Sequence, residues 1–182
     1  MTMMETQRLR LVPFGLAHAA ALERGPSELA AFLGVDVPEG WPRFPEAYTT
    51  ENFQGPNLAR DNDMSSTPWG SYLFLHRLRP LLVGSGGFKG EPVDGEVEFG
   101  YEIAPEFENQ GFATEAAKAM IAEAFSHPAV EFVLAHTLPE RNASTVVLEK
   151  AGLDFVGSID DPDDGTVWRW RLSRTGAQAD SE

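Results

Sequence analysis

The sequence contains no cysteine. This absence excludes disulfide bonds, thiolate metal ligands and a cysteine nucleophile. It therefore also excludes a covalent acyl-cysteine intermediate. Long apolar runs are also lacking, since no stretch approaches the roughly twenty residues of a membrane-spanning helix. Residues 1–11 do not show the basic start and apolar middle of a signal peptide. We therefore expect a cytoplasmic protein that does not enter a membrane.

Positive charge is scarce. The 182-residue chain has 14 Lys and Arg against 28 Asp and Glu, a formal net charge of -14. Such a field repels the phosphates of nucleic acids, so no nucleic-acid partner is expected. It favours an amine-bearing partner, although acidic surfaces also occur because they keep proteins soluble. No metal is expected either, because the histidines show no ligand spacing: His18, His76, His127 and His136.

The composition is otherwise that of an ordinary globular protein. Hydrophobic residues make up 42% of the chain, and its length suits a single domain with a sizeable core. Neither an internal repeat nor an interdomain linker is visible. We predict that residues 1–174 form this domain and that the small, polar residues 175–182 form a disordered tail.

One stretch in the middle of the chain changes its hydrophobic period. Residues 96–103 (EVEFGYEI) alternate apolar and polar side chains, which is typical of a β-strand. After a break at Ala104 and Pro105, apolar residues recur from about Gly111 at the spacings of an amphipathic helix. The sequence therefore predicts a strand, a short loop and a helix.

The start of this helix is a candidate anion site. The first amides of a helix have no partner within it, and the helix dipole places partial positive charge there. Gly111 and Ala113 are small enough to let a phosphate approach the backbone. A glycine also begins many helices that bind nothing, so both interpretations stay open on this pattern alone. The chain has neither a G-x-G-x-x-G nor a Lys-Ser/Thr phosphate loop, which disfavours an unrelated nucleotide-binding domain.

Two segments resemble the GNAT superfamily of N-acetyltransferases, in particular the RimJ/RimL branch that acetylates the N-termini of ribosomal proteins. The acetyl-CoA loop of that family reads Arg/Gln-x-x-Gly-x-Gly/Ala, and residues 108–113 (ENQGFA) occupy it, with the ATEA run of this branch at 113–116. Downstream, residues 139–144 (PERNAS) and 147–152 (VLEKAG) resemble the Asn-x-x-Ser and Glu-Lys-x-Gly-Phe segment of the family. Glu108 departs from the pattern, which leaves phosphate binding mainly to backbone amides and requires Glu108 to point outward.

The patterns and the resemblance together predict an α/β (α+β) fold. We expect a GNAT-like, mostly antiparallel sheet of six to seven strands with one splayed parallel pair, flanked by about four helices. The expected strands are 6–14, 69–78, 81–88, 96–103, 131–137, 155–159 and 167–172, and the expected helices are 16–24, 27–33, 111–125 and 142–150. A right-handed crossover would make 131–137 parallel to 96–103.

The resemblance implies acetyl-CoA as co-substrate. Its pantetheine arm would enter between the two parallel strands and pair with the backbone of Glu102 and Ile103, as an added strand does. The other cofactor contacts that it implies are in the loop, the helix start and the downstream segment: Glu108, Asn109, Gln110, Gly111, Phe112, Ala113, Thr114 and Asn142.

Direct transfer to an amine requires a base and a proton for the leaving thiolate. Glu98 is the predicted base, because the superfamily often carries a glutamate there and Gly100 leaves room above the sheet. The acidic face of residues 96–102 could instead be merely solvated. His136 and the acidic turn at 160–164 are competing sources of a base.

The thiolate donor departs from many relatives, which carry a tyrosine where this chain has Leu148. In the RimL-type pattern a serine near the helix start takes that role, and Ser144 matches it, although either Ser144 or Asn142 could be the helix cap. Aromatic residues of the irregular region 35–67 would either contact the acceptor or anchor a long loop: Trp41, Phe44, Tyr48 and Phe53.

The resemblance therefore implies an acyl-CoA-dependent N-acetyltransferase that moves an acetyl group directly to a primary amine, without a covalent enzyme intermediate. The acceptor would be a peptide or protein N-terminus or a small amine, and relatives often form homodimers. The altered loop and the missing tyrosine also allow a second interpretation, a catalytically weak acyl-CoA-binding regulatory module.

Overall fold

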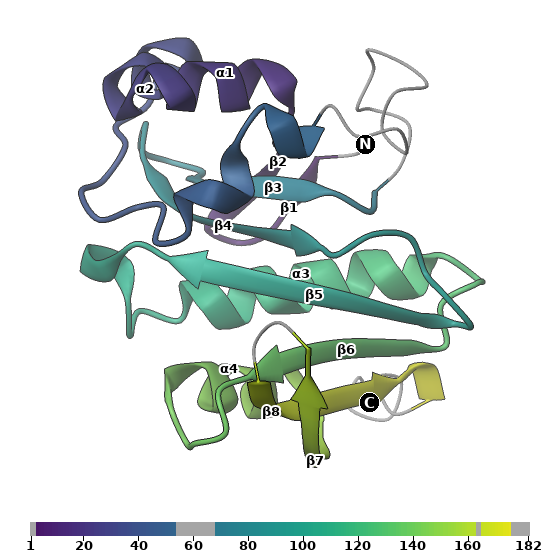
Figure 1. Cartoon of the computed structure of the whole chain (residues 1–182). Coiled ribbons are helices and arrows are strands. Elements are labelled where there is room, and N and C mark those ends of the chain that lie inside the picture. The colour runs from purple at the N-terminus through teal and green to yellow at the C-terminus, as the bar shows by residue number, and fades with distance from the viewer. Residues whose placement is uncertain (1–2, 54–67, 163–164, 176–182) are drawn as a thin grey trace.

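A computed structural model describes residues 3–53, 68–162 and 165–175. In this part of the chain, eight strands form one sheet in the order β1-β2-β3-β4-β5-β6-β8-β7 (Figure 1). The strands are β1 (Met4–Glu5), β2 (Leu9–Pro13), β3 (Ser71–His76), β4 (Leu82–Phe88), β5 (Glu96–Ile103), β6 (Phe132–Thr137), β7 (Asp154–Asp161) and β8 (Gly165–Ser173). The mixed, mostly antiparallel sheet is confirmed. It has one strand more than expected, because the two-residue β1 is too short to show a period.

Within the described residues, four α-helices accompany the sheet, as expected. They are α1 (Leu16–Arg24), α2 (Pro26–Leu33), α3 (Phe112–Ser126) and α4 (Ala143–Ala151), and short 3-10 turns are at Pro45–Tyr48, Glu51–Phe53 and Pro105–Phe107. In the view of Figure 1, α3 lies behind β5 and α4 behind β6 and β8, and α1 packs on α2. Gly34 ends α2 in the left-handed conformation (φ 68°), which glycine adopts without steric cost.

The two parallel strands β5 and β6 are joined along only part of their length. They pair at three positions, from Glu96 with Phe132 to Glu98 with Leu134. Beyond Glu98, β5 continues to Ile103 against β4, and β6 continues to Thr137 against β8. The expected splayed pair is therefore confirmed, and the facing backbone edges of the two strands part in the second half of β5 (Figure 1).

The inner face of β5 packs on α3. Val97, Phe99 and Ile103 alternate toward the core, where they are almost wholly buried. Small side chains such as Ala116 and Ala117 are buried on the facing side of α3. They let the helix lie close to the sheet, which sets the position of its first turn relative to the splayed strands.

The last turn of α3 is closed by Arg174. Its Nη1 donates to the carbonyl of Phe125 at 2.5 Å, its Nη2 to His127 at 2.6 Å and its Nε to Val130 at 3.0 Å. The last carbonyls of a helix lack partners within it, and a cation there also complements the helix dipole. Arg174 thus ties the end of β8 to α3.

Two further expectations concern membrane-spanning helices and the C-terminal tail. Among the described residues, none of the helices is long and apolar enough to cross a bilayer. Residues 176–182, which make up most of the predicted tail, lie outside the described residues.

Candidate active site

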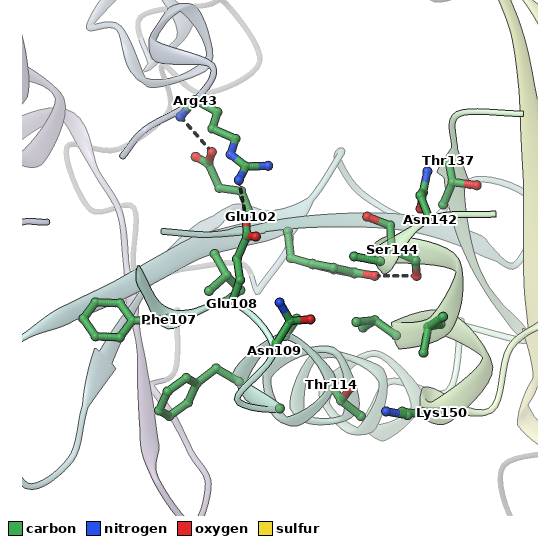
Figure 2. A pocket seen from close by; sticks show the side chains of 18 of the residues that line it. Arg43, Glu102, Phe107, Glu108, Asn109, Thr114, Thr137, Asn142, Ser144 and Lys150 are labelled. Atoms are coloured by element: carbon green, nitrogen blue, oxygen red, sulfur yellow. Dashed lines mark hydrogen bonds and ion pairs between the residues drawn. The ribbon is translucent and has the colours of Figure 1, made fainter. Parts of the chain in front are cut away.

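A cavity of about 680 Å³ lies where β5 and β6 part (Figure 2). Its walls come from the end of β5, the loop 107–111, the starts of α3 and α4, and the residues that follow β6. The predicted site residues that line it are Glu102, Ile103, Glu108, Asn109, Gly111, Phe112, Ala113, Thr114, Asn142 and Ser144. Glu98 and Gln110 are not in its lining. The structure thus brings together most of the predicted site from segments far apart in the sequence.

The loop before α3 turns sharply into the helix. Gly111 is the N-cap and has φ 82°, a left-handed conformation that strains residues with a Cβ, and Asn109 has φ 58°. The first hydrogen bond of the helix runs from Glu115 N–H to Gly111 O at 3.1 Å. The amides of residues 112–114 therefore have no partner within the helix and lie in the cavity lining, where they can donate to an anion.

Gln110 faces away from this cavity. Its carbonyl accepts from Arg8, and its side-chain amide donates to Glu106 O at 2.9 Å. Of the residues predicted to bind the cofactor, Gln110 thus contributes to the shape of the loop rather than to the cavity wall.

The sequence led us to expect that Glu108 points outward, but the structure shows otherwise. Its carboxylate lines the cavity and pairs with the guanidinium of Arg43 (Figure 2). The backbone N–H of Arg43 also donates to Glu102 Oε2 at 2.9 Å. Arg43 was missed by the sequence analysis, although it is the single basic residue between Arg24 and Arg60. A carboxylate beside a candidate anion site repels the anion unless a cation compensates its charge, and Arg43 is that cation.

Trp41 and Tyr48 anchor the loop that carries Arg43. Both are buried, and both reach the hydroxyl of Ser85 on β4, Trp41 Nε1 at 2.8 Å and the Tyr48 hydroxyl at 2.7 Å. Ser85 in turn donates to Glu102 Oε1 at 3.1 Å. Burial, followed by the nearby Glu102 charge, raises the pKa of Tyr48, so its phenol stays protonated.

Of the four aromatic residues considered for acceptor contact, Phe44 lines the cavity and is 59% exposed. Trp41 and Tyr48 have the anchoring role instead. The side chain of Phe53 lies outside the described part of the chain.

Glu98, the predicted base, is in contact with His136. Glu98 Oε1 lies 2.9 Å from His136 Nδ1 and 2.5 Å from Lys89 Nζ. The contact with Lys89 is an ion pair, and the one with His136 becomes an ion pair only when the imidazole is protonated. Among the described residues, Glu98 Oε1 and His136 Nε2 are buried without a hydrogen-bond partner. His136 lines the cavity whereas Glu98 does not. The imidazole is therefore the member of the pair that borders the cavity.

Asn142, not Ser144, caps α4. Asn142 Oδ1 accepts from Thr145 N–H at 3.1 Å, and Thr145 Oγ1 accepts from Asn142 N–H at 3.1 Å, which completes a reciprocal cap. The interpretation of Ser144 as the cap is wrong. Ser144 lies in the cavity lining one residue into the helix.

Tyr101 also lines the cavity and was not predicted as a site residue. Its hydroxyl donates to Ser144 O at 3.2 Å, so it links β5 to α4 across the splay. Burial raises its pKa, which keeps the hydroxyl protonated. The signal in the sequence was an aromatic residue near the end of the alternating strand, just before the loop.

Comparison with known proteins places these features in context. Residues 8–154 match the acetyltransferase (GNAT) domain family. No match is found among curated proteins. Among solved structures, a GNAT acetyltransferase from Bacillus anthracis is 19% identical, with a TM-score of 0.62 over 94% of this chain and 98% of that chain.

Two similar structures contain a ligand. RimL, a ribosomal L7/L12 alpha-N-protein acetyltransferase in complex with coenzyme A, is 16% identical, with a TM-score of 0.65 over 94% of this chain and 98% of that chain. The microcin C7 self-immunity acetyltransferase MccE, in complex with acetyl-CoA and AMP, is 14% identical, with a TM-score of 0.64 over 92% and 93%. At these identities the likeness shows a shared fold.

Proposed function

The chain belongs to the GNAT acetyltransferases, which use acetyl-CoA, and we propose that it transfers the acetyl group to a primary amine on a peptide or protein N-terminus or on a small molecule. The observation that carries the proposal is the cavity at the splay, which has the helix start at one wall and His136 at another, with Glu98 in contact with His136 outside the lining. The RimL likeness favours an N-terminal amine, because that protein is an alpha-N-protein acetyltransferase.

The cavity has the features that acetyl-CoA requires. The amides of residues 112–114 can donate to its diphosphate, and the small Gly111 and Ala113 leave the backbone accessible. At the parted edge of β5 the backbone groups of Ile103 face the gap and can pair with an extended arm, whereas those of Glu102 are directed at Ser85 of β4. Acetyl-CoA supplies the activated acetyl group when bound, and the remaining chemistry belongs to side chains of this chain.

His136 is proposed to take the proton from the acceptor amine. An ammonium has no lone pair to attack with, so a base must hold its proton during transfer. Protonation of His136 would place a cation 2.9 Å from Glu98 Oε1, and the carboxylate would stabilise that charge. In this proposal Glu98, the base predicted from the sequence, acts through His136.

Ser144 is proposed to relay a proton to the leaving sulfur: its hydroxyl gives its proton to the thiolate and takes one from water. It lies in the same cavity as His136, and Asn142 carries the capping role that would otherwise occupy its hydroxyl. With no cysteine in the chain, transfer would proceed directly from thioester to amine.

A thiol-release assay with acetyl-CoA tests the proposal. The cysteine-free chain adds no thiol background of its own. We expect release with some members of a panel of peptides and small amines, an acetylated acceptor by mass spectrometry, and no acetylated enzyme. Binding of acetyl-CoA without release on any amine would instead indicate a binding module. An absence of cofactor binding would refute the assignment of the cavity.

A further inference from the structure

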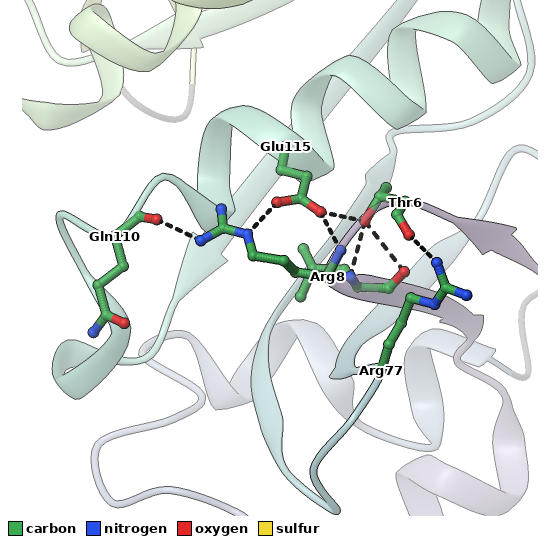
Figure 3. Close-up of polar contacts among 6 residues, drawn as sticks. Thr6, Arg8, Arg77, Gln110 and Glu115 are labelled. Atoms are coloured by element: carbon green, nitrogen blue, oxygen red, sulfur yellow. Dashed lines mark hydrogen bonds and ion pairs between the residues drawn. The ribbon is translucent and has the colours of Figure 1, made fainter.

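Arg8 lies directly before β2 and contacts the loop 107–111 and the start of α3 from outside the cavity (Figure 3). Its Nη1 donates to the carbonyl of Gln110 at 2.9 Å, and its guanidinium lies 4.3 Å from the centre of the Phe112 ring. A Cβ added at Gly111 would lie 3.4 Å from Arg8 Nη2. Arg8 therefore contacts Gln110 and Phe112 and lies beside Gly111, yet it is not in the cavity lining.

The bond to Gln110 determines which way the next amide points. A trans peptide is planar, so its carbonyl and the following N–H point in opposite directions. With the Gln110 carbonyl held by Arg8, the N–H of Gly111 is directed away from Arg8. Gly111 itself lines the cavity. The guanidinium thus fixes the orientation of an amide on the face of the loop that an anion would contact.

Glu115 keeps Arg8 in place. Its Oε2 accepts from Arg8 Nε at 2.7 Å, and its Oε1 accepts from the backbone N–H of Arg8 at 2.7 Å and from the Thr6 hydroxyl at 2.5 Å. Glu115 is in the first turn of α3, and its side chain is only 16% exposed. Glu115 thus holds Arg8 at two points, its backbone N–H and its Nε, which leaves Nη1 directed at the carbonyl of Gln110.

We propose that Arg8 is a positioning residue for the diphosphate-binding loop, clamped by Glu115 so that the loop amides face the cofactor. This inference rests on the proposed function, in that the loop must be the diphosphate site. It assigns a role to residues 6–8, which directly precede β2. The simpler alternative is that Arg8 only connects β2 to α3. Loss of a positioning role would weaken only ligands that carry the diphosphate, whereas loss of a structural role would weaken all ligands equally.

Arg8→Gln is the test variant, and S-acetyl-pantetheine, which lacks the diphosphate and the nucleotide, is the matched substrate. We expect kcat/KM for acetyl-CoA to fall roughly 10- to 100-fold, the effect of losing one charged hydrogen bond. The value for S-acetyl-pantetheine should stay within about twofold of wild type, because that substrate does not reach the loop. Arg8→Lys keeps the positive charge, but a single ammonium cannot contact both Glu115 and Gln110 as the guanidinium does. It should therefore give an intermediate loss of kcat/KM for acetyl-CoA.

Arg77→Gln is the matched control. Arg77 donates to the carbonyl of Thr6 at 2.6 Å in the same cluster and does not contact the loop (Figure 3). It should leave the ratio of the two substrates unchanged. Equal losses with both substrates in Arg8→Gln would show a merely structural role and overturn the proposal. No loss with either would overturn it too.

The same comparison can be made without turnover. Calorimetric titration with coenzyme A and with pantetheine should show weaker binding of coenzyme A alone in the variant. If wild type binds coenzyme A but acetylates no amine, the proposed function fails while this titration still decides the role of Arg8. If Arg8→Gln does not fold, Arg8→Lys and Glu115→Gln take its place, and unchanged coenzyme A affinity in both would refute the proposal.

Discussion

Oε1 of Glu98 lies 2.9 Å from Nδ1 of His136, and the two residues come from the neighbouring parallel strands β5 and β6. The last pair between these strands is Glu98 with Leu134, so His136 follows two residues later on the same face. The contact therefore lies where the strands begin to part, beside the cavity in which an acceptor and the thioester would meet.

Glu98→Gln should lower kcat, and Lys89→Gln should change it much less. The variant without the carboxylate loses the charge that would stabilise a proton taken up by His136 during transfer. Lys89 also contacts Glu98 Oε1, but its side chain is 58% exposed, so solvent screens its effect. Steady-state kinetics on both variants measures the difference.

His136→Gln separates the two candidate bases. It should lower kcat by about 100-fold or more, and adding Glu98→Gln to it should cause little further loss. If His136→Gln keeps a kcat near that of wild type while Glu98→Gln loses it, Glu98 acts on the amine without the imidazole.

Arg43→Gln should weaken acetyl-CoA binding, because it leaves Glu108 uncompensated beside the diphosphate site. We expect about a tenfold higher Kd, and the double variant with Glu108→Gln should recover most of it. Stability should barely change, since both side chains are at least 40% exposed. Titration calorimetry completes the double-mutant cycle, and additive effects would mean that the pair does not act as one unit.

Ser144→Ala should slow turnover while the thermal midpoint stays close to that of wild type. Asn142→Ala should show the stability loss instead, about 1 kcal/mol, because Asn142 carries the cap. Thermal unfolding and thiol release on both variants test this. A Ser144→Ala variant with wild-type turnover would remove the serine from the mechanism.

Glu115 should make the fold sensitive to acid. Burial alone would raise its pKa, but hydrogen bonds from Thr6 and Arg8, together with the charge of Arg8, outweigh burial and hold the pKa below the ordinary 4.5. A lowered carboxyl pKa contributes stability above the ordinary pKa, and this contribution is lost as the pH falls through the lower, folded-state value. Denaturant titrations from neutral pH to below 4.5 should show a shallower loss in Glu115→Gln than in wild type.

Much of the architecture was predictable from the sequence because neighbouring residues carry it. The alternation of residues 96–103 and the helical spacing after Gly111 gave β5 and α3 nearly to their ends. The helices expected at 27–33 and 142–150 end next to Gly34 and Gly152 in the structure, and both glycines adopt left-handed conformations. The splay followed from the family resemblance, and the pairing of β5 with β6 confirms it.

The contacts that shape the site could not be predicted, because they join distant positions. Arg8 and Glu115 are 107 residues apart in the sequence, and Trp41 and Ser85, which form a hydrogen bond, are 44 residues apart. Hydrophobic periodicity carries no information about such polar partners. The cap of α4 was ambiguous for a different reason: Asn142 and Ser144 both favour capping, and only the backbone geometry at Asn142 decides between them.

The strand order β6-β8-β7 also constrains how the protein is assembled during synthesis. β8 leaves the ribosome after β7 but lies between β7 and β6, so β7 has no place on the sheet until β8 arrives. The same late segment carries Arg174, on which the last carbonyls of α3 depend. The half of the sheet that walls the cavity therefore closes only after residues 165–174 have been translated, and until then β6 presents an open edge.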